Sequence, residues 1–208
     1  MPKTYSEKER AEITARLKSV ANELMMEKGV KKATVDEIVK RAGIPKGTFY
    51  LFYPSKEMLF FDVAQDFHTQ VDEHISLGLS RIIEDNKLDP SRDGAFAEYI
   101  DDVTDVILGA MDITFSSCLK VLLEPDAMKL ILSKLPDEVL EEHRDHDKHM
   151  GAGIIEMMAT QKGLSVGAVV GSFTMILFGG MYKQVIGEEN LRESMRMLIK
   201  GVIGQILI

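Results

Sequence analysis

The sequence predicts an all-α protein of about nine helices, with an N-terminal three-helix domain and a larger C-terminal helical domain. Apolar residues recur at spacings of three and four along most of the chain, which is typical of amphipathic helices. Gly and Pro separate these stretches, and no segment shows the alternation of a strand. We expect the domain boundary between residues 1–54 and 55–208.

The first two helices are expected near residues 6–28 and 35–41. An apolar stripe marks the first, made of Ile13, Leu17, Val20, Ala21 and Leu24. Gly29 then suits a left-handed end. Thr34 and Glu37 have the spacing of a capping box, which predicts the start of the second helix, and Gly43 closes that helix.

A third short helix and a long fourth helix follow. Pro45 suits the first turn of a helix from Lys46 to about Phe52, because proline needs no amide donor there. Pro54 interrupts the pattern, and Ser55 is expected to cap a helix that runs to about Gly78. Further helices are expected at about 94–123, within 127–135, and at 136–161, 165–186 and 190–207.

Composition narrows the class of protein. The 208 residues are 45% hydrophobic and 28% charged, as in an ordinary globular protein. The single cysteine, Cys118, excludes an intramolecular disulfide and a zinc site made of several cysteines. No apolar stretch follows Met1, so we expect no secretory signal and a cytoplasmic protein.

Charge is distributed unevenly along the chain. The net charge is −8, yet residues 1–62 carry a net +3 and the remainder a net −11. The excess is concentrated in residues 28–56, with seven basic and two acidic side chains. A basic segment ahead of an acidic body is compatible with a nucleic-acid partner despite the negative total.

Two short helices joined by a glycine turn predict a helix-turn-helix in residues 34–52. Its core is expected to contain Ile38, Val39, Ala42, Ile44 and Phe49. Lys46, Thr48 and Tyr50 then remain near the start of the second helix, the end that enters a major groove. Gly47 allows the backbone to approach a phosphate, and Tyr50 and Lys56 are expected to reach phosphate oxygens.

This segment resembles the TetR family of bacterial transcriptional regulators over about 50 residues. The resemblance rests on Thr34, Ile38, Ala42–Ile44, Gly47–Tyr50, Phe52–Tyr53 and Lys56–Leu59. It implies a homodimer that binds a palindromic operator in double-stranded DNA, acts as a repressor and is released by a small-molecule effector in the C-terminal domain. It also implies a dimer interface in the last two helices.

The resemblance further assigns residues to the DNA interface. Lys46, Gly47, Thr48 and Tyr50 fall in the recognition helix, and Thr34 and Lys56 at positions that contact the DNA backbone. Leu51 and Phe52 depart from the family pattern, since many members have Tyr or His there. The final helix carries a stripe suited to dimerisation, made of Leu191, Met195, Leu198, Val202 and Ile206.

An effector pocket is expected between helices of the C-terminal domain, mainly apolar and suited to a small apolar or amphipathic molecule. Its candidate lining is Met111, Phe115, Cys118, Met157, Met175, Phe178 and Tyr182. No zinc-protease motif, phosphate-binding loop or serine nucleophile elbow is present in the sequence. We therefore expect no catalytic residues, no cofactor and no metal requirement.

Two alternatives remain open at the level of sequence. His143, His146 and His149 lie among acidic residues, which would suit a metal-responsive regulator, although three-residue steps drift around a helix and do not converge on one ion. Residues 163–182 carry no charge and are long enough to span a bilayer. Eight of these twenty residues are Gly, Ser or Thr, which favours a packed helix over a membrane anchor.

Overall fold

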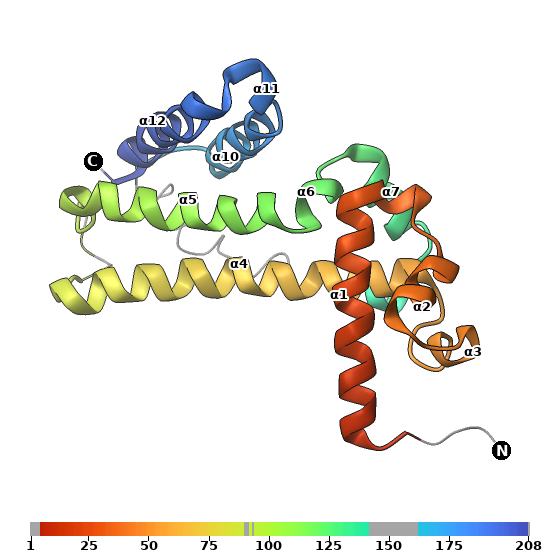
Figure 1. Ribbon diagram of the computed structural model, residues 1–208. Coiled ribbons are helices and arrows are strands. Elements are labelled where there is room, and N and C mark those ends of the chain that lie inside the picture. The colour runs from red at the N-terminus through yellow and green to blue at the C-terminus, as the bar shows by residue number, and fades with distance from the viewer. Residues whose placement is uncertain (1–4, 90–91, 93, 142–161, 208) are drawn as a thin grey trace. The chain divides into compact units, whose positions relative to one another are not determined.

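The computed structural model describes residues 5–89, 92, 94–141 and 162–207, and these ranges contain helices and connecting turns but no strand (Figure 1). The all-α prediction is confirmed. Eleven helical segments are described in these ranges: α1 (Glu7–Lys32), α2 (Val35–Ala42), α3 (Lys46–Phe49), α4 (Lys56–Asn86), the 3₁₀ turn η1 (Ala97–Tyr99), α5 (Ile100–Ser116), α6 (Leu119–Leu122), α7 (Pro125–Leu132), α10 (Val166–Gly180), α11 (Lys183–Ile186) and α12 (Glu188–Leu207).

The chain divides into two compact units. The first takes its described residues from Met1–Thr69 and Thr114–Glu142, and the second from Gln70–Ile113 and His143–Ile208. The grouping differs from the sequence-based division, because α6 and α7 pack on α1 although they follow it by about ninety residues. The predicted boundary after residue 54 separates two functions, and the packing units do not test it. It stays a prediction.

Helix α1 begins with a capping box in which the Ser6 hydroxyl accepts from the Glu9 amide and the Glu9 carboxylate accepts from the Ser6 amide. The predicted stripe is largely confirmed, since Ile13, Leu17, Ala21 and Leu24 are buried. Gly29 has the expected positive φ of 74°, but it produces a kink and the helical turn continues to Lys32. Positive φ strains a residue with a Cβ, so glycine is well suited to this position.

Helices α2 and α3 form the predicted helix-turn-helix within the first unit (Figure 1). The Thr34–Glu37 capping box starts α2, and Gly43 ends it in the left-handed conformation with φ 66°. The apolar faces of both helices turn inward, and Ile38, Val39, Ala42 and Phe49 are buried. Burying these side chains holds two helices that are too short to be stable alone.

Helices α4, α6 and α7 complete the first unit. The Ser55 hydroxyl accepts from the Met58 amide at 3.1 Å and caps α4 as predicted, and Leu59 and Phe60 are fully buried. In the other part of this unit, the Cys118 amide donates to Asn22 Oδ1 on α1 at 2.9 Å. This bond joins the turn before α6 to the middle of α1.

The second unit contains the later part of α4, with α5, α10, α11 and α12. Helices α4 and α5 approach closely at glycines, and a Cβ on Gly78 would lie only 2.6 Å from Val106 Cγ2. Gly78 therefore serves helix packing and does not end α4, which continues to Asn86. Helix α12 is joined to α5 by three ion pairs, Arg192–Asp112, Arg196–Asp105 and Lys200–Asp101.

Some expected helices are shorter or divided. The helix expected at 94–123 becomes η1, α5 and α6, with a break at Ser117 and Cys118, and the segment 165–186 divides into α10 and α11. Most of the helix expected at 136–161, and with it Met157 and the three histidines, lies outside the described residues. No helix in the described ranges has the length and apolar character needed to cross a membrane.

Candidate nucleic-acid interface

The start of α3 is the best-placed candidate surface. Phe49 is fully buried and anchors the short helix, which leaves Lys46, Gly47 and Tyr50 exposed, with Tyr50 at 51%. Tyr50 stacks edge-on against Phe49, with ring centroids 5.2 Å apart. Tyr50 therefore contacts a buried ring while about half of it stays accessible to solvent, as a groove or phosphate contact requires.

Lys46 has a carboxylate partner in this structure. Its Nζ lies 2.8 Å from Asp36 Oδ1 on α2, and both side chains are more than half exposed. The hydrogen bond with Asp36 raises the pKa of Lys46 above its usual value. Lys46 is thus charged at neutral pH, and contact with DNA would exchange one anion for another.

Thr48 does not face solvent. It is only 7% exposed, and its hydroxyl lies 3.1 Å from the Tyr5 hydroxyl. We expected Thr48 to stay near the exposed end of the helix with Lys46 and Tyr50, and its placement differs because α3 turns this face toward the segment before α1. A role for Thr48 in reading bases stays a prediction.

The N-terminal segment is a part of this site that motif analysis missed. Tyr5 packs against Phe52, with ring centroids 6.0 Å apart, and the Arg10 guanidinium lies 4.8 Å from the centroid of the same ring. Tyr5 and Arg10 precede Phe52 by more than forty positions and carry no pattern of their own. The charge of Arg10 and the aromatic character of Tyr5 were the available signals.

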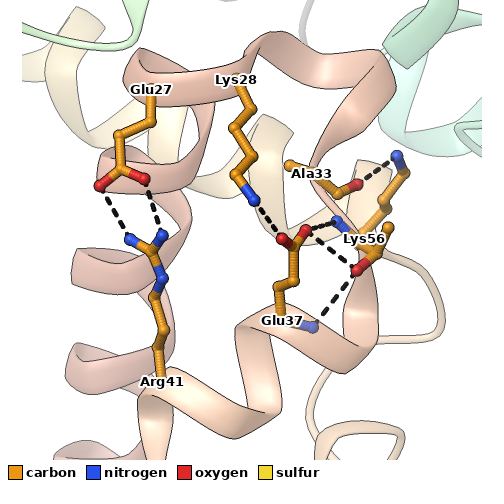
Figure 2. A network of polar contacts seen from close by, with 7 residues as sticks. Glu27, Lys28, Ala33, Glu37, Arg41 and Lys56 are labelled. Carbon is orange, nitrogen blue, oxygen red and sulfur yellow. Dashed lines mark hydrogen bonds and ion pairs between the residues drawn. The ribbon is translucent and has the colours of Figure 1, made fainter.

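Thr34 is exposed at the start of α2 and belongs to a polar network with Glu37 and Lys28, which Figure 2 labels. Its hydroxyl accepts from the Glu37 amide at 3.3 Å, and the Glu37 carboxylate also pairs with Lys28. The hydrogen bond with Lys28, followed by that with Thr34, lowers the pKa of Glu37. The Glu37 carboxylate therefore already partly satisfies the positive N-terminal end of α2.

Lys56 lies at the start of α4, half-buried, with its ammonium on backbone carbonyls at the end of α1. Nζ donates to Val30 O at 2.9 Å and to Ala33 O at 2.7 Å, and lies 3.5 Å from Lys31 O. Figure 2 shows the bond to Ala33 beside the Lys28–Glu37 pair. The predicted phosphate contact of Lys56 stays untested, but the ammonium already has acceptors.

Carboxylates reduce the basic character of this region. Arg41 pairs with Glu27 at 2.7 Å, and the hydrogen bond from Arg41 lowers the pKa of Glu27 (Figure 2). Lys18 pairs with Asp62 and Asp66 on α4 at 3.0 and 2.8 Å. Counting basic residues between 28 and 56 did not reveal these carboxylates, because Glu27, Asp62 and Asp66 lie outside that segment.

The structure does not bring the effector candidates into one described cavity. Met111, Met175, Phe178 and Tyr182 belong to the second unit, whereas Phe115 and Cys118 belong to the first. Met111 and Cys118 are buried, and Met175 and Tyr182 are 70% and 64% exposed. The effector assignment remains a prediction.

A groove of about 350 Å³ lies between α10 and α12 in the second unit. Its walls are largely apolar and include Met175, Ile176, Leu191, Met195, Leu198 and Val202. Four of these residues belong to the stripe predicted for dimerisation. Of the described effector candidates, Met175 lines this groove.

No group of three His, Cys, Asp or Glu in the described part of the chain is placed to hold a metal ion. The histidines proposed for a metal-responsive alternative, His143, His146 and His149, fall outside that part. Cys118 is fully buried, and burial raises the pKa of its thiol to about 12. A thiol with this pKa is unreactive near neutral pH.

Comparison with known proteins identifies relatives of the N-terminal part. Residues 18–63 match the model of the tetR family of bacterial regulatory proteins. Two uncharacterized HTH-type transcriptional regulators of Bacillus subtilis (strain 168), YdgC and YvdT, are 46% and 42% identical to this chain over 55 residues. The aligned part covers 26% of this chain and 28% of each relative.

Solved structures share the fold over nearly the whole chain. SCO4454, a TetR-family transcriptional regulator from Streptomyces coelicolor, superposes with a TM-score of 0.60 at 15% identity, covering 95% of this chain and 97% of its own. The fatty acid degradation regulator FadR from Bacillus halodurans gives a TM-score of 0.57 at 16% identity, with 97% of each chain covered. At 15% and 16% identity, the similarity to these structures shows a shared fold alone.

Proposed function

We propose that the chain is a member of the TetR family of bacterial regulatory proteins, and that it regulates transcription by binding double-stranded DNA through α2 and α3. Lys46, Gly47 and Tyr50 make the direct contacts, Thr34 lies at the DNA backbone, and Thr48 supports the recognition helix from its inner face. The role is binding rather than catalysis, and the site of action is the cytoplasm.

One observation carries this proposal. The buried Phe49 and the left-handed turn at Gly43 hold α3 against α2, so that the backbone at the start of α3 is in place before DNA arrives. Ordering this backbone in advance lowers the entropy lost on binding. A helix-turn-helix uses this end of its second helix to meet base edges.

A palindromic operator requires two copies of this chain. The apolar groove between α10 and α12 supports a homodimer through these helices, because a monomer would leave Met175 and Leu198 exposed to water. A two-fold dimer would present its recognition helices to successive major grooves, roughly 34–36 Å apart.

Regulation by a small apolar or amphipathic effector, with repression as the default state, completes the proposal. An effector weakens DNA binding if it favours a dimer arrangement in which the two recognition helices no longer match the groove spacing. A coupling free energy of about 1–3 kcal/mol would lower the affinity roughly 5- to 150-fold. Residues 1–54 would act as the DNA-binding domain and 55–208 as the effector and dimerisation domain.

The decisive experiment selects DNA from a library of duplexes that contain a randomised segment of about 25 base pairs. The full chain should enrich a palindromic sequence, and its affinity for that duplex should exceed its affinity for a scrambled duplex by about 10³-fold or more. A Lys46→Ala/Tyr50→Ala double variant serves as the control and should lose most of this preference. Failure to enrich any sequence at low salt would overturn the proposal.

A further inference from the structure

The ammonium of Lys56 occupies a site formed by the end of α1. Its two short hydrogen bonds go to Val30 O and Ala33 O, and Lys31 O lies at 3.5 Å, so three backbone carbonyls surround Nζ. Val30 and Ala33 are buried at 2% and 0% exposure. The Lys56 ammonium also lies over the aromatic ring of Phe60, with Nζ 5.8 Å from the ring centroid.

Helix geometry explains why a cation fits there. The last carbonyls of a helix have no amide partner in the following turn, and they form the negative end of the helix dipole. The kink at Gly29 gives the final turn of α1 a new direction, and Val30 and Lys31 belong to that turn. A lysine supplies three donors and a positive charge to these carbonyls.

The position of this site connects it to the candidate DNA interface. Ala33 immediately precedes Thr34, the N-cap of α2, and Lys56 is the first residue of α4. One side chain therefore joins the end of α1, the start of α2 and the start of α4. Displacing the ammonium toward a phosphate would leave partly buried carbonyls without this donor, which is unfavourable.

We propose that Lys56 is a positioning residue, which supports DNA binding by holding the α1–α2 junction against α4 and makes no direct contact with phosphate. The inference rests on the proposed DNA-binding function and changes the role expected for Lys56 from the family resemblance. It assigns the phosphate contacts to other side chains, with Lys46 as the nearest candidate on α3.

Salt dependence separates the two roles of Lys56. Each phosphate contact adds about 0.9 to the slope of log affinity against log salt, whatever the DNA sequence. Lys56→Met removes the charge and the donors and keeps a side chain of similar length. We expect this variant to bind the selected duplex about tenfold more weakly, as for the loss of one to two net hydrogen bonds, with an unchanged salt slope.

Lys46→Met is the matched control, since it removes one exposed lysine of the same interface. Its salt slope should fall by about 0.9. The Lys56→Met variant should also lose more affinity for the selected duplex than for a scrambled duplex, because misplaced helices impair base contacts more than general attraction. A fall of about 0.9 in the slope for Lys56→Met, with equal losses on both duplexes, would overturn the inference.

A measurement on the unmodified chain covers the case in which Lys56→Met does not fold. In protein labelled with ¹⁵N at lysine Nζ, the Lys56 ammonium resonance should persist with slow proton exchange and should not shift when the selected duplex binds. A shift as large as that of Lys46 would refute the positioning role. If the wild type binds neither duplex, the proposed function itself fails, which is a separate outcome.

Discussion

Lys46 and Asp36 face each other at 2.8 Å, so the candidate interface contains a carboxylate that competes with DNA for this exposed lysine. Such a pair weakens the attraction of Lys46 to phosphate in nonspecific complexes, which offer few other contacts. A contact that forms only when Lys46 leaves Asp36 therefore favours sites that supply several contacts at once. On this argument, we expect Asp36 to increase the discrimination between DNA sequences.

Replacing Asp36 with Asn tests this argument. The Asp36→Asn variant should bind a scrambled duplex about two- to fivefold more tightly, as expected for releasing an exposed ion pair, and should discriminate less between selected and scrambled DNA. Fluorescence anisotropy with both duplexes measures the effect. Glu27→Gln, which releases Arg41 from a comparable exposed pair away from α3, is the control. An equal gain in both variants would point to net charge alone.

The buried thiol of Cys118 predicts how the free energy of unfolding changes with pH. Its pKa rises from 9.0 to about 12 through burial, so between these pH values the unfolded chain binds fewer protons than the folded chain. The free energy of unfolding then falls as pH increases, by about 1.4 kcal/mol per pH unit in the middle of this window.

Urea unfolding at pH 8 and pH 10.5 measures this decline, which Cys118→Ala should reduce. Some decline should remain in the variant, because burial and the hydrogen bond to Asp62 raise the pKa of Tyr53 as well. As an independent check, the thiol of the folded wild type should resist a thiol reagent at pH 8 and react after unfolding. Identical pH dependence in both proteins would contradict the assignment.

At the scale of elements, two glycines of the helix-turn-helix have opposite roles. Gly43 has φ 66° and ends α2, whereas Gly47 lies within α3 without a positive φ. An added Cβ would meet no atom within 4 Å at either position. Any cost at Gly43 is therefore conformational, and any effect of Gly47 on DNA binding comes from the space that it leaves open.

The two alanine variants form a matched pair. Gly43→Ala should lower the free energy of unfolding by about 1–2 kcal/mol, because a Cβ disfavours the left-handed conformation. Gly47→Ala should leave stability unchanged or raise it by up to about 1 kcal/mol, yet it should weaken DNA binding because the methyl group keeps the backbone away from phosphate. Thermal unfolding and DNA affinity, measured on both variants, test the pair. Unchanged DNA affinity in Gly47→Ala would exclude close backbone approach.

At the scale of the whole molecule, the exposed groove between α10 and α12 predicts a dimer. Leu198 lines this groove and is 57% exposed, so Leu198→Glu should place two charges in the symmetric interface and shift the protein to monomer. Met197→Glu is the control, since Met197 lies on the same helix, is 68% exposed and does not line the groove.

Sedimentation velocity at micromolar concentration distinguishes these outcomes. The wild type and Met197→Glu should sediment as dimers and Leu198→Glu as a monomer. Loss of the dimer should also weaken binding to a palindromic duplex far more than to a single half-site, because the second half-site then binds independently. A monomeric wild type would contradict both the interface and the half-site argument.

The helix-turn-helix was accessible from sequence because its signals are local. Capping residues, turn glycines and apolar spacing act over three or four positions, and the Thr34 capping box, the Gly43 turn and the buried Phe49 were predicted correctly. Helix ends were less accessible where distant packing decided them. Glycine is common at helix ends, which favoured an end at Gly78. In the structure α4 continues past Gly78, where the absence of a side chain allows close packing against Val106.

The linear chain alone thus established the all-α class, the turn between α2 and α3 and the buried faces of these helices, since each depends on backbone preferences and hydrophobic spacing among near neighbours. Only the folded chain decided which polar groups meet. Tyr5 reaches Thr48, and Lys56 reaches the carbonyls at the end of α1, across more than twenty positions. Long-range folding selects such partners, and the partners determine whether a charged side chain remains available to DNA.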